Sequence, residues 1–153
     1  MSFNDVPPPY EAAQESAPAF TLSSWIRRVG GAVIDRALVF IVSFVVSFVF
    51  SILGSDSLAE TLGSLAGLAF LVWQLIVQGN TGQTIGKKAI GISVVRESDA
   101  RPIGPVISIA RFIAHFLDAI ICLLGFLLPL VDKKRQTIAD KLLQTVVIDV
   151  PKN

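Results

Sequence analysis

The stretch that decides the fold reads GGAVIDRALVFIVSFVVSFVFSIL and covers residues 30–53. Its only charged side chains, Asp35 and Arg36, lie near its start, and as a helix it is long enough to cross a hydrocarbon core of about 30 Å. Arg27 and Arg28 stand just before it, and basic residues mark the cytoplasmic end of a transmembrane helix. We therefore predict a first transmembrane helix over 30–53, with the N-terminus in the cytoplasm.

The composition agrees with a protein in a lipid bilayer. Of the 153 residues, 52% are hydrophobic and 16% are charged, whereas soluble domains carry about 25% charged residues. The mean hydropathy is +0.66. One cysteine and one histidine leave no internal disulfide, and a metal or haem site would have to use carboxylates almost alone. We expect a cell-membrane protein with no metal, no cofactor and no nucleic-acid partner.

Residues 1–22 are rich in Pro, Ala, Ser and Gln and contain three acidic side chains. This composition predicts a disordered cytoplasmic tail. The tail lacks the basic start and the cleavage site of a signal peptide, so we expect the first apolar run to be retained as an anchor. Residues 23–150 form the predicted membrane domain.

A second apolar run, over 61–77, predicts a second transmembrane helix near the short end of the usual length. The connector before it contains acidic but no basic residues, whereas residues 79–105 contain four Lys or Arg residues. By the positive-inside rule, the connector is outside and residues 79–105 are cytoplasmic.

The third apolar stretch, over 105–131, leaves two alternatives. A simple crossing would place the basic C-terminal residues, from Lys133 to Lys152, outside, against the positive-inside rule. Gly125 and Pro129 are able to break a helix. The sequence therefore favours a re-entrant or broken helix that returns to the cytoplasm.

Two β-branched runs, 90–95 and 145–150, have the composition and length of strands. A lone strand leaves its backbone groups unpaired, so we expect the two runs to pair on one side of the membrane, with the C-terminus in the cytoplasm. The predicted fold is an all-α membrane protein with two transmembrane helices, a third re-entrant or broken apolar segment, and a small cytoplasmic β pair.

The informative side chains are ionisable groups in the apolar runs, because each costs at least about 2.5 kcal/mol at mid-membrane unless it finds water or a partner. Arg28 and Asp35 are seven residues apart, and so are Arg111 and Asp118. Seven residues are nearly two helical turns, so each pair shares one helix face. His115 lies on that face in the second pair, and the five residues form a candidate intramembrane polar seam.

The seam has two interpretations. Small residues Gly31 and Ala32 would let the third segment approach the first helix and place His115 beside the aspartates. In one interpretation the seam carries protons or a cation, with the arginines as counter-charges. In the other, the arginines reach the interface and each aspartate is held by an ion pair that locks the packing. Whether Arg36 faces a partner or the interface stays open.

Four blocks then occur in order along the chain: Arg28 with Asp35, TGQTIGKKAIGISVV at 81–95, DKKRQTIAD at 132–140, and TVVI at 145–148. Together they resemble the RDD family, mostly bacterial membrane proteins named for an arginine and two aspartates. The likeness covers about residues 23–150. The Pro-rich tail is similar to that of actinobacterial proline-rich-antigen-like members.

The resemblance maps the family's arginine to Arg28 and its first aspartate to Asp35. The second aspartate is best matched by Asp140, with Asp118 as the other candidate. Ala139 stands where the family often has a histidine, so no proton role of that histidine carries over to this chain. The family's molecular function is largely unestablished, and the resemblance implies only transport of ions or small ligands as an expectation.

We therefore expect a small multi-pass membrane protein, with proton-coupled transport of a cation or small ligand as the first hypothesis. Three short membrane segments cannot easily enclose a pathway, so we expect a homo-oligomer, with Gly63 and Gly67 of a GxxxG pattern as one contact. The alternative is a non-transporting scaffold whose basic loop, β pair and tail bind a partner. No Ser-His-Asp or Cys-His arrangement in the sequence suggests an enzyme.

Overall fold

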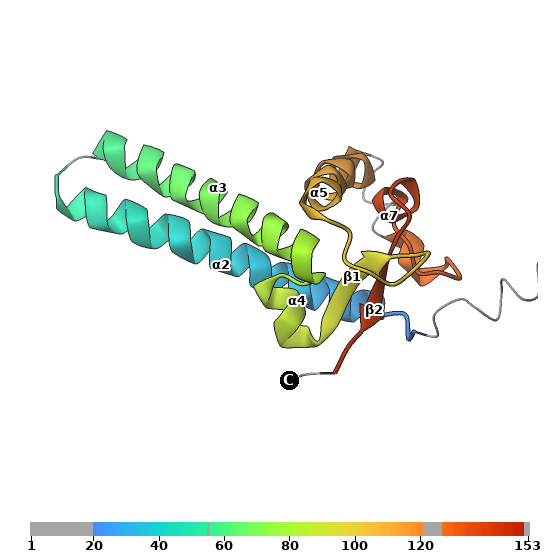
Figure 1. Cartoon of the computed structure of the whole chain (residues 1–153). Helices are drawn as coiled ribbons and strands as arrows, with labels where there is room; N and C mark the ends of the chain where they lie inside the picture. Colours follow the sequence, from blue (N-terminus) through green and yellow to red (C-terminus); the bar gives the residue numbers. More distant parts are fainter. Residues whose placement is uncertain (1–19, 55, 121–126, 152–153) are drawn as a thin grey trace, which may run out of the picture.

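The computed structural model shows two long antiparallel helices, α2 (Trp25–Ile52) and α3 (Asp56–Thr81), as a hairpin that extends away from the other elements (Figure 1). Both helices are long and apolar enough to cross a membrane, as the sequence predicted. The described part of the chain consists of residues 20–54, 56–120 and 127–151, without the side chains of 116–120. Most of the predicted tail therefore lies outside the described residues.

Both hairpin helices are longer than predicted, for local reasons. Gly54 takes a left-handed conformation, with φ of +82°, in the turn, and the carboxylate of Asp56 lies in the first turn of α3, where the helix dipole favours a negative charge. At its other end α3 continues past the predicted boundary to Thr81. The polar side chain of Gln78 is accommodated there, because its Nε2 donates to Ser108 Oγ at 2.9 Å, and Ser108 belongs to helix α5 (Pro105–Ile120).

The GxxxG pattern of α3 serves the contact between the two hairpin helices. Gly63 and Gly67 are buried, and a Cβ built on Gly63 would lie 2.7 Å from the carbonyl oxygen of Ser43 on α2. Small residues of this kind let two helix backbones approach closely. These glycines are consequently not available as the contact between copies that the sequence suggested.

The outer surface of the hairpin is apolar. Phe40, Phe44 and Phe48 are exposed on α2, and neighbouring rings in this row stack with centroids 6.1 and 6.0 Å apart. A wholly apolar exposed row is unfavourable in water and favourable in a hydrocarbon phase. This surface suits contact with lipid.

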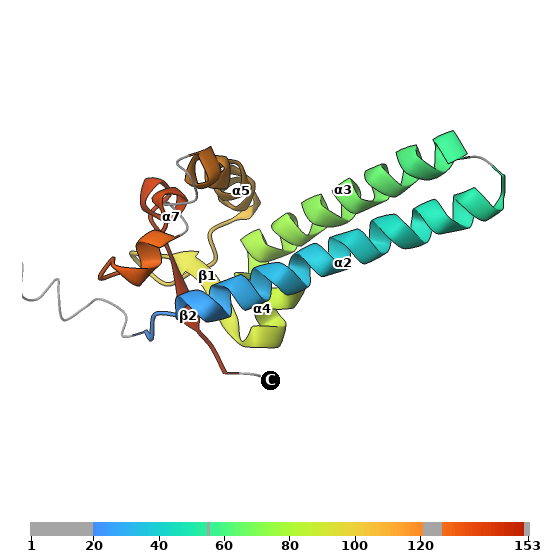
Figure 2. The same cartoon turned by 180° about the vertical axis from the view of Figure 1, so that it is seen from behind.

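The predicted β pair is confirmed. Strands β1 (Ile92–Arg96) and β2 (Thr145–Asp149) are antiparallel, with Val94 opposite Val147. The short helix α4 (Ile85–Ile90) leads into β1. Both strands lie at the end of the hairpin where α2 begins and α3 ends, seen from both sides in Figures 1 and 2.

The third apolar stretch is broken rather than one straight helix. Helix α5 (Pro105–Ile120) is followed, after residues outside the described part, by the 3-10 helix η2 (Leu128–Leu130) and by α7 (Ile138–Leu142), which leads back to β2. Pro129 lies within η2, and Gly125 lies outside the described residues. In Figures 1 and 2 α5 is seen nearly end-on, so it crosses the base of the hairpin instead of running along it.

The faces of α5 are reversed relative to those of a helix in a water-soluble protein. Ser108 and Arg111 point inward and are buried, whereas Val106 and Ile113 are 80% and 60% exposed. Seven residues separate the two exposed side chains, so they share a face. A helix that buries polar groups and exposes apolar ones suits a site beside lipid.

We predict that Gly63→Val destabilises the hairpin. The added side chain meets the backbone of α2, and overpacking a close contact costs about 1–3 kcal/mol. Thermal unfolding in a neutral detergent, followed by circular dichroism, measures the loss. Leu65→Val, at an exposed position of the same helix, is the control, and equal melting temperatures for the two variants would refute this role of Gly63.

Candidate functional site

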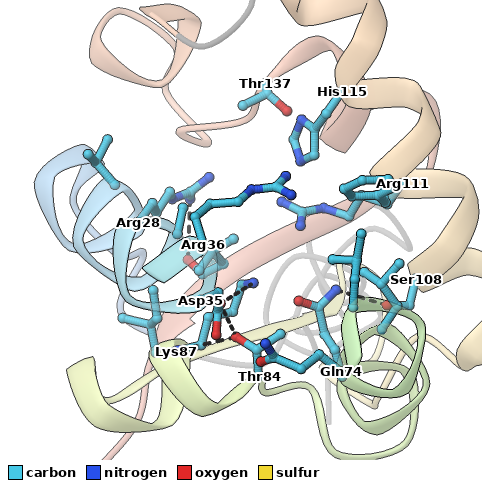
Figure 3. A pocket seen from close by; sticks show the side chains of 18 of the residues that line it. Arg28, Asp35, Arg36, Gln74, Thr84, Lys87, Ser108, Arg111, His115 and Thr137 are labelled. Atoms are coloured by element: carbon cyan, nitrogen blue, oxygen red, sulfur yellow. Dashed lines mark hydrogen bonds and ion pairs between the residues drawn. The ribbon is translucent and has the colours of Figure 1, made fainter. Parts of the chain in front are cut away.

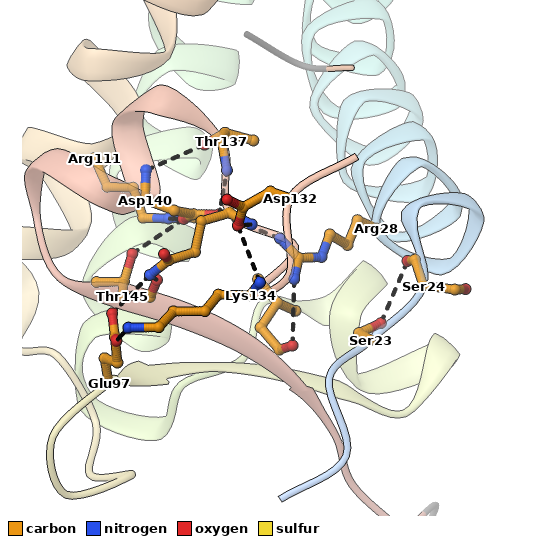
Figure 4. A network of polar contacts seen from close by, with 12 residues as sticks. Ser23, Ser24, Arg28, Glu97, Arg111, Asp132, Lys134, Thr137, Asp140 and Thr145 are labelled. Carbon is orange, nitrogen blue, oxygen red and sulfur yellow. Dashed lines mark hydrogen bonds and ion pairs between the residues drawn. The ribbon is translucent and has the colours of Figure 1, made fainter. Parts of the chain in front are cut away.

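Asp140 is a fully buried carboxylate, with 0% exposure, that binds two arginines. Its Oδ1 accepts a hydrogen bond from Arg111 Nε at 2.7 Å and forms an ion pair with Arg111 Nη2 at 2.6 Å. Its Oδ2 accepts one from Arg28 Nη1 at 3.2 Å (Figure 4). One carboxylate on α7 therefore holds α2 and α5 together.

The start of α7 fixes the position of Asp140. Thr137 is the N-cap residue, and its Oγ1 accepts from Asp140 N at 3.1 Å while Asp140 Oδ2 accepts from Thr137 N at 3.3 Å. This reciprocal capping box satisfies two backbone donors at the helix start. Thr145 Oγ1, on β2, donates to Asp140 Oδ1 at 3.0 Å. The carboxylate thus also joins α7 to the sheet.

Asp140 is ionised at neutral pH. Burial alone would raise the pKa of Asp140, but the positive charges of Arg111 and Arg28 outweigh burial and hold the pKa below its ordinary value. Hydrogen bonds between ionised groups of this geometry are stronger than those between neutral groups. The cluster is an ion triad rather than a proton-accepting site.

From the sequence, we placed Arg28 with Asp35, and Arg111 with Asp118, on one helix face, and named no ion partner for either arginine. In the structure both arginines bind Asp140 instead. The side chain of Asp118 lies outside the described residues. The spacing along one helix could not reveal Asp140 as the partner of Arg28, because a distant segment brings this carboxylate in.

Asp35 forms a second centre with the start of α4. Its Oδ1 accepts from Gly86 N at 2.7 Å, its Oδ2 accepts from Thr84 Oγ1 at 2.5 Å, and Lys87 Nζ is 3.9 Å from Oδ2. Thr84 is the N-cap residue of α4 and accepts from Lys87 N at 3.2 Å. Asp35 therefore serves as the anion at the positive end of this short helix.

Helix α4 lies very close to α2 at this centre. A Cβ built on Gly86 would lie 2.2 Å from the carbonyl oxygen of Gly31 and 2.8 Å from Asp35 Oδ1, so only glycine fits. From the sequence, Gly31 and Ala32 were predicted to let the third segment approach α2. Gly31 packs against α4 instead. Ala32 lines a cavity at the base of the hairpin.

A cavity of about 300 Å³ lies between the two centres, at the base of the hairpin. Figure 3 shows Arg28, Arg36 and Arg111 directed toward its middle. Four of the predicted seam residues line it. Its ionisable lining residues are Arg28, Asp35, Arg36, Lys87, Arg111 and His115.

The remaining ionisable groups take defined places around the cavity. The guanidinium of Arg36 lies 5.3 Å from the centre of the Phe112 ring, a cation–π distance, so Arg36 faces α5. His115 lies on the side of Thr137 (Figure 3). Burial, followed by repulsion from Arg111, lowers the pKa of Lys87 to about 8. Lys87 therefore changes charge close to neutral pH.

Two buried donors in the cavity wall lack a hydrogen-bond acceptor within the described part of the chain, Gln74 Nε2 and Arg28 Nε. Gln74 is 2% exposed, and its Oε1 accepts from Ile85 N at 3.3 Å, so its amide nitrogen is left for another partner. A buried donor without an acceptor costs about 1–3 kcal/mol. These donors suit a ligand that carries acceptor oxygens.

Sequence reasoning missed Lys87, Thr84 and Gln74, although one signal was present. The tripeptide Gln-Thr-Ile occurs at 83–85 and at 136–138, and each copy opens a short helix that leads into a strand. The side-chain amides of the two glutamines donate to backbone oxygens of Ile92 and Thr145, both at 2.9 Å. This repeat marks both helix starts. No local pattern marks Gln74.

An apolar helical hairpin with a charged cavity at its base defines a small integral membrane protein. A family model described as RDD family matches residues 22–144. The chain belongs to the RDD family. The Arg and two Asp of the resemblance, Arg28, Asp35 and Asp140, are divided between the two centres beside the cavity.

Curated relatives extend this assignment. The chain is 39% identical over 162 residues to the proline-rich antigen homolog of Mycobacterium tuberculosis. The aligned region covers 90% of this chain and 68% of that protein. The chain is also 45% identical over 98 residues to the proline-rich antigen of Mycobacterium leprae. This aligned region covers 63% of this chain and 39% of that protein. No solved structure matches the chain significantly.

We predict that Asp140→Asn is strongly destabilising, because it leaves two buried guanidinium groups without their counter-charge. Removing one partner of a buried ion pair costs about 3–5 kcal/mol. Asp99→Asn, which removes an exposed ion pair with Arg96, should cost at most about 1 kcal/mol. Thermal unfolding of both variants in detergent measures the difference.

The melting temperature at low pH provides a second measurement on the Asp140→Asn variant. Because the folded-state pKa of Asp140 lies below its unfolded value, the stabilisation is present at neutral pH and is lost as the pH falls through the folded-state pKa. The gap in melting temperature between wild type and Asp140→Asn should therefore narrow below about pH 4. A constant gap, or equal losses in Asp140→Asn and Asp99→Asn, contradicts the buried triad.

Proposed function

We propose that this membrane protein binds a small anionic ligand in the cavity at the base of the hairpin. The observation that supports the proposal is the charge of the described side chains. Four cationic side chains line the cavity, against Asp35 in the wall and Asp140 behind it. These four cations and two aspartates leave two positive charges in excess, and an excess of positive charge in the wall of a cavity attracts an anion.

The two carboxylates are poor candidates for binding a free cation. Asp35 already accepts from a hydroxyl and a backbone N–H and lies beside Lys87. Asp140 accepts from two arginines and from Thr145. The proposal therefore keeps a small ligand from the sequence hypothesis but reverses the sign of its charge.

Lys87 would link this binding to protons. With a pKa of about 8, Lys87 is partly neutral in weakly alkaline solution, and an anion beside it favours the protonated form. Ligand binding and proton uptake then assist each other. A proton-coupled role is supported in this form, with the lysine rather than an aspartate as the titrating group.

We place the cavity on the cytoplasmic side, because Arg27 and the lysines of α4 lie at that end of the hairpin and basic residues stay inside. A homo-oligomer belongs to the proposal as well, since two spanning helices cannot surround a path. The contact between copies would not use Gly63 and Gly67, because these glycines pack against α2 within the hairpin. The proposed role is binding and carriage of a ligand, not catalysis.

We predict that sulfate raises the melting temperature of the full chain in a neutral detergent more than chloride does at equal ionic strength. Arg36→Gln should weaken sulfate binding at least about tenfold, since hydrogen bonds to charged groups contribute about 1.5–3 kcal/mol. Arg36→Lys should retain part of the affinity for sulfate. Arg101→Gln, at an exposed position away from the cavity, is the matched control and should bind as wild type does.

The pH dependence tests the part of Lys87. Sulfate keeps its charge over the range used, so a fall in affinity reports on the protein. The affinity should fall about tenfold between pH 7 and pH 9 in wild type and stay nearly constant in Lys87→Gln. Stabilisation by sodium or lithium that is lost in Asp35→Asn, with none by sulfate, would instead support a cation site.

A further inference from the structure

The lining of the cavity divides into a cationic part and an apolar part. The basic side chains gather at the base of the hairpin, where α2, α4 and α5 meet (Figure 3). The apolar part consists of Val29, Ala32 and Val39 of α2, Leu71 and Leu75 of α3, and Phe112 of α5. A simple inorganic anion would contact only the cationic part, whereas an amphiphile with an anionic head group would contact both parts.

The apolar part extends toward the middle of the spanning helices. Val39 is eleven residues beyond Arg28 on α2, which is about 16 Å along the helix axis. Leu71 lies correspondingly inside α3, ten residues before its end at Thr81. Arg36 lies between Ala32 and Val39 on α2, so the apolar lining begins among the charges and continues past Arg36 to Val39 and Leu71, in the direction that a lipid chain takes in a leaflet.

The wall of the cavity on α2 contains exposed residues, and a mouth on this side of the helix is part of the inference that follows. Ala32 and Arg36 line it and are exposed, four residues apart on one helix face. The next residue on this face is Phe40, where the exposed phenylalanine row begins. A mouth that continues into an apolar exposed row opens to lipid rather than to water.

We infer that the ligand is a phosphate ester carried by a lipid, which enters sideways from the surrounding leaflet. This inference rests on the proposed anion binding. The phosphate oxygens accept hydrogen bonds from Arg28, Arg36 and Lys87 and from the free amide hydrogens of Gln74. The volume of about 300 Å³ suits a head group and the first part of a chain, and the rest of the chain leaves through the mouth along Phe40.

The test is binding of phosphatidylglycerol and phosphatidylcholine to the full chain in neutral detergent, measured by native mass spectrometry. Wild type should bind phosphatidylglycerol at least about tenfold more tightly than phosphatidylcholine. Arg36→Gln should lose this preference, and Arg101→Gln should keep it. An unchanged preference in Arg36→Gln would show that the anionic lipid binds elsewhere, and it would overturn the inference.

Competition separates a lipid from a free anion. Phosphatidylglycerol should displace sulfate from wild type. Phe40→Ala should lower the affinity for phosphatidylglycerol at least about threefold and leave the affinity for sulfate unchanged. Phe48→Ala, two turns farther along the row, is the matched control with little effect on either. Sulfate or inorganic phosphate binding without displacement by the lipid overturns this inference and leaves the anion site standing. If neither sulfate nor phosphatidylglycerol binds, both the lipid inference and the proposed anion site are rejected.

Discussion

The buried carboxylate of Asp140 holds the elements at the base of the hairpin together. A charge with 0% exposure is tolerated only when it is fully paired, so Arg28 and Arg111 must both remain beside it. Through these contacts α2, α5 and α7 occupy fixed places, and Thr145 attaches the sheet. The base of the hairpin is therefore assembled from segments far apart in the sequence.

The second carboxylate determines the charge of the cavity. Asp35 is occupied by the start of α4, so it cannot also neutralise Arg36 on the next residue of the same helix. The two aspartates thus build the protein, while a surplus of positive charge is left facing the cavity. The same arrangement brings Lys87 into a buried site, where its pKa falls to about 8.

The fold was largely predictable from the sequence, because long apolar runs and β-branched runs carry their own signal. The two spanning helices and the antiparallel pair follow from such local patterns. The site was less predictable: Arg28, Asp35, Arg111 and His115 do line one cavity, but their ion partners come from other elements. Only the resemblance to the family pointed to Asp140, since its burial among α2, α5 and β2 is a tertiary property.

In the proposed function, the cavity holds an anion between the basic groups of α2 and α4. An experimental structure of the protein with selenate, located by its anomalous scattering, tests this most directly. We expect selenate within hydrogen-bonding distance of Arg36 and Lys87, beside the free amide of Gln74. Selenate bound only outside the cavity, or a cation bound to Asp35, would contradict it.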